Sequence, residues 1–261
     1  MSSVEMKLHG AIARIEIDNP PVNALSEAVL QGLGGAIGDA EAVGARVVLL
    51  TSTGTKAFAA GADLSELEHL LGSPEAAASH VALTDSVFGA IRSCPIPVVV
   101  ALHANAVGGG LELALACDVI VAEDHVRLGL PESSLGLIPG AGGTQQLTHI
   151  VGPVLAKKLL MFGSLLTAAE AHAIGLVSEV CADGAAIERA TELASRLATG
   201  SPASLAAIKR VVHEGVLHPD RGAEAERAEF LQLLQGEDAQ EGCAAFLSKR
   251  RPSFGRLPER S

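Results

Sequence analysis

Two short apolar runs, at residues 46–51 and 97–102, constrain the fold of this chain most. Neither run alternates apolar with polar residues, so each indicates a strand that is buried on both faces, as in a parallel sheet covered by helices. A loop of small residues follows each run and leads into a helical pattern. Strand–loop–helix units continue to about residue 181, and helical patterns alone follow. This order predicts an α/β domain with a helical C-terminal appendage.

The remaining elements follow from periodicity and from capping and turn signals. Residues 4–18 alternate well enough for two short strands, which the proline pair after Asn19 ends. Ser26 is the predicted N-cap of a helix that reaches about residue 41, and Asp63 that of a short helix. We also predict strands at 119–122 and 126–130, and helices at 74–92, 111–117, 202–216 and 220–235. The predicted domains are 1–200 and 201–261.

Aliphatic side chains must build the core of this protein. Hydrophobic residues make up 48% of the 261 residues, yet aromatic residues make up only 2%, with six Phe and no Tyr or Trp. A chain of this length buries enough surface to fold without a disulfide or a metal. The absence of tyrosine excludes any reaction that needs a tyrosine acid, base or nucleophile.

The charge balance and the chain start exclude several partners. With 19 Lys and Arg against 30 Asp and Glu, the net charge is −11, which is unfavourable for binding nucleic acid. The four cysteines show no metal-ligand spacing, and the first ten residues show no apolar signal core. Polar residues interrupt the most apolar stretch, 96–122, so it does not predict a membrane span. A soluble, cytoplasmic protein is expected.

Two loops lie where an α/β sheet collects ligands, between a buried strand and the next helix: residues 56–63 and 104–112. Their small residues let a ligand approach the main chain, and the first amides of a helix lack an intrahelical acceptor. One amide from each loop would bind the same oxygen and stabilise negative charge on it, as an oxyanion hole does. The alternative is that the glycines only permit tight strand-to-helix turns.

Two acidic residues in apolar surroundings are candidates for proton transfer. Glu112 has only apolar neighbours within 111–116, and Glu132 follows Pro131. Burial of a carboxyl raises its pKa toward neutrality, which suits a general acid or base. For Glu112 the alternatives are an exposed position on an amphipathic helix, or a structural hydrogen bond to a backbone amide. No metal-ligating, P-loop or serine-hydrolase motif accompanies these acids.

Seven segments, taken in order and spacing, resemble the enoyl-CoA hydratase/isomerase (crotonase) family, and within it the hydratases most. The resemblance covers nearly the whole chain. Its segments are NPPVNAL (19–25), AFAAGADL (57–64), GGGLELA (108–114), CD (117–118), PE (131–132), GLIPGAGGT (136–144) and FLSKR (246–250). It implies a crotonase-like spiral of ββα units with a C-terminal helical region that forms trimers, or hexamers of two trimers. It also implies an acyl-CoA thioester substrate, with no separate cofactor and no metal.

The resemblance assigns roles to individual residues. The amides of Ala62 and Gly109 would bind the thioester oxygen. Glu112 and Glu132 would hold one water, and one would take its proton while the other protonates C2, which converts a trans-2-enoyl-CoA into a 3-hydroxyacyl-CoA. The turn at Gly140 would help to position that water. The implied CoA contacts are Val22, Ala60, Asp63, Leu64, Phe246 and Lys249.

Departures from the family pattern leave alternatives open. Ser65 stands where many hydratases have a lysine near the CoA phosphates, and Lys56 is either a phosphate contact or a solvated loop residue. The C-terminal contacts can also come from a neighbouring subunit. The alternative functions are a Δ3-Δ2 enoyl-CoA isomerase or other enolate chemistry, which would need chiefly Glu132, and a non-catalytic CoA-binding protein. The stretch 66–83 is expected to shape the acyl pocket.

Overall fold

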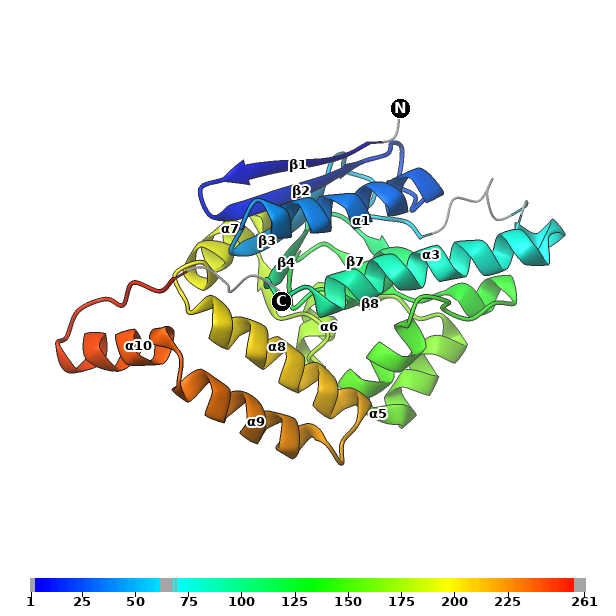
Figure 1. The fold of residues 1–261 in the computed structure, drawn as a ribbon. Helices are drawn as coiled ribbons and strands as arrows, with labels where there is room; N and C mark the ends of the chain where they lie inside the picture. The colour runs from blue at the N-terminus through cyan, green and yellow to red at the C-terminus, as the bar shows by residue number, and fades with distance from the viewer. Residues whose placement is uncertain (1–2, 62–67, 69, 256–261) are drawn as a thin grey trace.

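The two doubly buried runs form the centre of a six-stranded sheet with the order β1-β2-β3-β4-β6-β9. All residues of β3 (Val47–Ser52) and β4 (Val98–Leu102) are buried. In the computed structural model, which describes residues 3–61, 68 and 70–255, β1 (Ser3–His9) pairs antiparallel with β2 (Ile12–Asp18). From β2 onward neighbouring strands are parallel, through β6 (Val119–Glu123) to β9 (Glu179–Cys181) (Figure 1).

A second, three-stranded sheet has the order β5-β7-β8. Its strands are β5 (Ala106–Val107), β7 (Arg127–Gly129) and β8 (Leu166–Thr167). After β4 the chain adds β5 to this sheet and then forms helix α4 (Gly109–Leu115). After β6 it adds β7 and then forms the 3-10 helix η1 (Glu132–Leu135) and helix α5 (Gly143–Phe162). Each of these two turns therefore gives one strand to each sheet and then a helix, as in the predicted spiral of ββα units, whereas β1 and β2 both belong to the large sheet.

Aliphatic side chains fill the space on both faces of the large sheet, as the composition predicts. On one face, α1 (Glu27–Ala42) and α3 (Pro74–Ser93) contribute to the larger core cluster. On the other face, alanines of α7 (Ala186–Leu197) pack against Val47, Leu49 and Val99. Phe58 and Phe88 are fully buried, and both belong to the larger cluster.

Most predicted element boundaries hold within two residues. Ser26 is the N-cap of α1 and accepts the Val29 N–H, as expected. Helix α4 begins at Gly109, two residues before the predicted start. The predicted cap Asp63 lies outside the described residues. The helices that follow α5 are α6 (Ala168–Ala173), α7, α8 (Pro202–Leu217), α9 (Gly222–Leu234) and α10 (Glu237–Leu247). Of these, α8 and α9 were predicted with bounds, whereas α6, α7 and α10 were not.

Helices α8, α9 and α10 lie together at one side of the sheets (Figure 1). A half-buried lysine links α8 to the core: Lys209 Nζ donates to Asp118 Oδ2 at 2.7 Å and to the carbonyls of Ile91 and Ile96. Helix α9 has no buried residue. These helices expose large apolar side chains, namely Ile208, Val212, Leu217, Phe230, Leu231, Leu234, Phe246 and Leu247. The domain boundary at residue 200 stays a prediction.

Across the described residues, no helix combines the length and the apolar character needed to cross a membrane. The cytoplasmic location expected from the sequence stays a prediction.

Candidate active site

A cavity of about 400 Å³ brings together residues from both glycine-rich loops and both candidate acids. Its wall includes Ala60, Gly109, Glu112, Glu132 and Gly140. Ala60 comes from the loop that follows β3, and Gly109 is the first residue of α4, which also carries Glu112. Glu132 opens η1, and Gly140 belongs to the turn before α5. The fold therefore places five of the predicted site residues on one cavity.

The backbone at the start of α4 is shaped by two glycines in left-handed conformations. Gly108, the N-cap of α4, has φ +58°, and Gly61 has φ +84°. A Cβ on Gly61 would lie 3.2 Å from the Gly109 nitrogen, so the two loops touch through bare backbone. As the first residue of the helix, Gly109 has no intrahelical acceptor for its N–H, and the helix dipole favours an anion there. This amide suits one half of an oxyanion hole.

Ala62, the other predicted donor, lies outside the described residues, as do Asp63, Leu64 and Ser65. The described neighbour Gly61 lines the cavity next to Gly109. The assignment of Ala62 and Gly109 as a pair therefore stays a prediction. The glycines also make the tight turns that were the alternative explanation, so the two interpretations are compatible.

Gly110 leads to a stability prediction, because a Cβ at this position would lie 1.9 Å from the carbonyl oxygen of Ala59. We expect Gly110→Ala to lower the free energy of unfolding by about 3 kcal/mol, the upper end of the usual cost of overpacking. The matched control is Gly89→Ala on α3, where a Cβ meets nothing within 4 Å. There the change should be neutral or stabilise the helix by up to about 1 kcal/mol. Urea unfolding of both variants tests this, and equal effects would contradict it.

Glu112 is buried, with 5% of its surface exposed. Its Oε1 accepts the N–H groups of Ala141 and Gly143, each at 2.8 Å. Burial raises the pKa of Glu112, and these two amide hydrogen bonds oppose that rise. The structure thus excludes the exposed alternative for Glu112 and shows the backbone-bonded one. Since only one carboxyl oxygen is held by the amides and the residue also lines the cavity, a chemical role remains open to it.

Glu132 is half-buried, and its carboxyl lies over the start of α4. Its Oε1 is 3.0 Å from the position of a Cβ on Gly108. Its Oε2 is buried and has no hydrogen-bond partner among the described residues. Burial raises the pKa of Glu132, and the neighbouring Glu112 raises it further. A buried carboxyl oxygen without a partner is costly unless it binds something, so this oxygen is suited to meet a ligand in the cavity.

The rest of the cavity wall is mostly apolar. Helix α3 contributes one face, on which His80 and Thr84 are the polar side chains. Residues 70, 71, 77, 80 and 81 belong to the stretch expected to shape the acyl pocket, and all five line the cavity. The apolar lining residues include Leu25, Leu30, Ala77, Val81, Phe88, Leu135, Leu137 and Ile138. Such a wall suits an aliphatic group.

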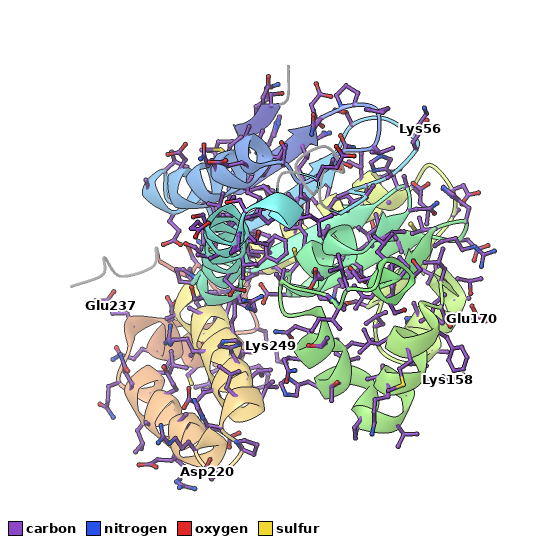
Figure 2. All side chains as sticks on the ribbon, turned by 90° about the vertical axis from the view of Figure 1, so that its right-hand side faces the viewer. Lys56, Lys158, Glu170, Asp220, Glu237 and Lys249 are labelled. Carbon is purple, nitrogen blue, oxygen red and sulfur yellow. The ribbon has the colours of Figure 1, made fainter. Side chains whose placement is uncertain are left out.

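Three of the predicted CoA contacts do not line this cavity. Val22 is half-buried in the turn that follows β2. Phe246 is 83% exposed, and Lys249 is exposed just beyond α10. Figure 2 shows Lys249 well separated from Lys56, which is exposed on the loop after β3. Within one chain the structure therefore does not bring Phe246 and Lys249 to the two glutamates, and all three contacts stay predictions.

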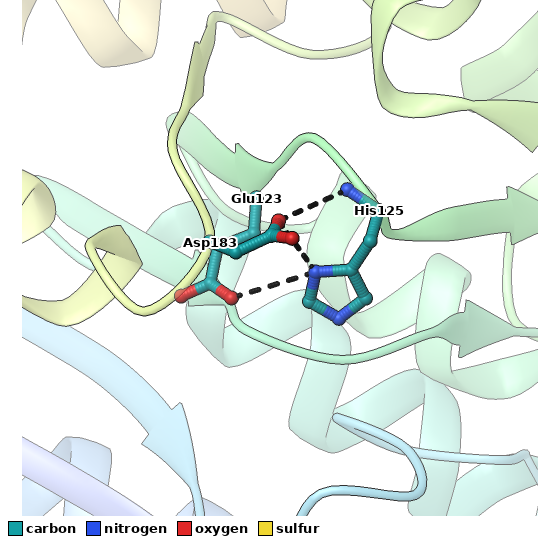
Figure 3. A group of neighbouring side chains, drawn as sticks. All are labelled: Glu123, His125 and Asp183. Carbon is teal, nitrogen blue, oxygen red and sulfur yellow. Dashed lines mark hydrogen bonds and ion pairs between the residues drawn. The ribbon is translucent and has the colours of Figure 1, made fainter.

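The fold also creates a cluster that the sequence did not reveal, consisting of Glu123, His125 and Asp183 (Figure 3). One ligand-type atom from each lies within 4.8 Å of the others. His125 Nδ1 is 2.7 Å from Asp183 Oδ1, and the buried Glu123 accepts the Ala186 N–H at the start of α7. None of the three lines the cavity. These contacts explain the cluster as a link between the β6–β7 turn and α7.

Sequence reasoning missed the amides that hold Glu112. The resemblance gives the turn at Gly140 a role in positioning water, but it does not indicate that the next residues bind Glu112. Ala141 and Gly143 lie 29 and 31 residues from Glu112. The sequence signal for this contact is the glycine at position 143. The structure shows why no side chain fits there: a Cβ would lie 2.9 Å from Glu112 Oε1.

Known proteins match this chain over almost its whole length. The profile of the enoyl-CoA hydratase/isomerase family matches residues 7–257. A probable enoyl-CoA hydratase of Bacillus subtilis is 36% identical over 97% of this chain and 99% of its own length. The 2,3-dehydroadipyl-CoA hydratase of Escherichia coli gives the same three figures, 36%, 97% and 99%. A solved enoyl-CoA hydratase from Polaromonas has 32% identity and a TM-score of 0.92, covering 97% of this chain and 100% of that one. These similarities confirm the predicted fold class.

Proposed function

This chain is an enzyme of the enoyl-CoA hydratase/isomerase family, and we propose that it adds water across the C2=C3 bond of a trans-2-enoyl-CoA to give a 3-hydroxyacyl-CoA. The observation that carries the proposal is the cavity in which Glu112 and Glu132 meet beside the first amide of α4. The names of several relatives, including a short-chain-enoyl-CoA hydratase of Clostridium acetobutylicum, support it.

The surroundings of the two carboxyls support different roles. Hydrogen bonds from Ala141 and Gly143 favour the ionised form of Glu112, which suits a general base. Glu132 has no such donors on its buried Oε2, which favours the protonated form and suits a general acid. Glu112 would take a proton from water as the oxygen bonds to C3, and Glu132 would give a proton to C2. The carboxyls then return to their starting states by exchanging one proton with solvent.

The main chain supplies the electrostatic part of this proposal. Negative charge develops on the thioester oxygen as the water adds to C3. The Gly109 N–H, with Ala62 as the predicted second donor, would bind that oxygen. Preorganised donors of this kind typically contribute several kcal/mol to catalysis. Gly140, which lies one residue before the Ala141 donor, would help to hold the water near Glu112.

The substrate class follows from the same cavity and from the family. Among the described lining residues, the side chains are apolar apart from His80, Thr84 and the two acids, so an aliphatic acyl group would fit along α3. The CoA moiety would contact Val22, Ala60 and the 62–64 segment. The reaction needs neither a metal nor a separate cofactor in this proposal, because the carboxyls and amides provide all the proton transfers and charge stabilisation.

Self-association would complete the CoA site. The apolar side chains exposed on α8 to α10 need a covering surface, and large exposed apolar patches mark interaction sites. We therefore propose a homotrimer, or a dimer of trimers, in which Phe246 and Lys249 reach the site of a neighbouring subunit. Light scattering of the full chain should give the mass of three or six copies. A monomer at micromolar concentration would contradict this assembly.

The reaction itself is tested by mixing the purified protein with crotonyl-CoA and following the loss of enoyl absorbance. We expect hydration without any added metal or cofactor, and a panel of short, long and branched enoyl-CoAs would define the acyl group. Failure to hydrate any member would contradict the hydratase assignment. Conversion of a 3-enoyl-CoA without hydration would indicate an isomerase, and thioester binding without turnover would indicate a non-catalytic protein.

A further inference from the structure

Arg92 is a half-buried cation near the C-terminal end of α3. Within residues 3–61, 68 and 70–255, no hydrogen bond or ion pair is found for its guanidinium. It lines a second cavity of about 420 Å³, next to α4, α5 and α8. The nearby acid Asp118 is already engaged by Lys209 and by the Val98 N–H. None of its nitrogens is among the buried side-chain atoms that lack a partner, so the guanidinium keeps access to water while lying beside α4 and α5.

The guanidinium lies next to the turn that holds Glu112. Arg92 Nη1 lies 3.7 Å from the position of a Cβ on Gly142, which has φ +97°. Gly142 stands between Ala141 and Gly143, and these two residues donate their N–H groups to Glu112 Oε1. One three-residue turn therefore lies against the cation and also binds the carboxylate.

We propose that Arg92 is a positioning residue for Glu112: it lies beside the 141–143 turn and stabilises the negative charge of the general base. The inference rests on the proposed function, in which Glu112 takes the proton from water. Arg92 does not line the cavity that holds the two acids, so it would act through the turn and through its charge.

The electrostatics agree with this geometry. Burial lowers the pKa of Arg92, and Asp85 and Glu112 partly oppose that change. Burial is the largest influence on the pKa of Glu112 and raises it, whereas Arg92 lowers that pKa and Asp85 raises it. Helix α3 thus carries two charges with opposite effects on Glu112. Among the described residues, the other titratable groups that line these cavities are Glu132 on η1, His80 on α3, Cys117 and Asp118 after α4, and Lys209 and His213 on α8.

The opposite effects of Arg92 and Asp85 define the test, which measures kcat/KM for enoyl-CoA hydration against pH. In Arg92→Gln, the acidic limb of the pH profile should move to higher pH. As a result, kcat/KM should fall about three- to tenfold at about pH 6 and change little at about pH 8. Asp85→Asn should move the limb the other way. Arg92→Lys should restore most of the wild-type profile because it keeps the charge.

Lys158→Gln is the matched control, since it removes the same charge from an exposed position on α5 at the edge of the molecule (Figure 2). Lys158→Gln should leave the acidic limb of the pH profile at its wild-type position. The inference is overturned if Arg92→Gln lowers kcat/KM equally at every pH, or if Lys158→Gln moves the limb as far. A carboxyl ¹³C titration of Glu112, assigned with Glu112→Gln, measures the same coupling without turnover. A wild type that hydrates no enoyl-CoA would refute the proposed function, whereas an unmoved Glu112 titration would refute the role of Arg92.

Discussion

Glu112→Gln is expected to lower kcat for enoyl-CoA hydration by about 10²- to 10⁴-fold, the usual contribution of a positioned general base. The amide oxygen of glutamine can still accept the Ala141 and Gly143 N–H groups, so the turn and the fold should persist. What disappears is the ability to take a proton from water. Steady-state kinetics with crotonyl-CoA, together with thermal unfolding of the same preparation, check both parts of this expectation.

Glu123→Gln provides the control for the loss of a buried acid. Glu123 is 4% exposed and accepts the Ala186 N–H, yet it lies outside the catalytic cavity. This variant should lose stability rather than turnover per folded molecule. If Glu112→Gln keeps near-wild-type hydration, Glu112 is not the base. If it loses hydration but still converts a 3-enoyl-CoA, one acid is enough for isomerisation and two are needed for hydration.

The sequence predicted the framework of the site well because local patterns determine it. The doubly buried runs predicted β3 and β4. The glycine-rich segments that follow these runs were predicted to collect a ligand, and the structure shows Ala60 and Gly109 on one cavity. The apolar neighbours of Glu112 made it a candidate but left an exposed position and a backbone hydrogen bond open as alternatives, and only the structure shows that it is buried. Short-range patterns thus indicate which segments form the site, but they do not decide how each acid is placed.

Contacts across long sequence separations could not be predicted from one sequence. The amides of Ala141 and Gly143 meet Glu112 only after α5 packs beside α4. Arg92 ends the predicted helix at 74–92, and nothing in the local sequence indicates that its guanidinium lies next to Gly142. The predicted contacts of Phe246 and Lys249 depend on how copies of the chain assemble. Such features follow from tertiary packing, which periodicity does not encode.

Glu132→Gln should also lower kcat for hydration by about 10²- to 10⁴-fold, because glutamine cannot protonate C2. Its effect on stability should depend on pH. Burial raises the pKa of Glu132 above its ordinary value of 4.5, so the folded protein binds the proton more tightly than the unfolded chain. Wild type therefore loses stability as pH rises through that raised pKa, whereas the variant has no such group to ionise. Urea unfolding at about pH 4 and about pH 7 measures the difference.

The free energy of unfolding of Glu132→Gln, relative to wild type, should thus increase from the lower pH to the higher one. Glu132→Asp is the positional control: it keeps a carboxyl but withdraws it from Gly108, so it should lose turnover while retaining a pH-dependent stability. A pH-independent difference for Glu132→Gln would show that the carboxyl is not strained by burial. In that case Glu132 would be poorly suited to deliver a proton, and the acid would have to be sought among the other groups of the cavity, of which His80 on α3 is the first candidate.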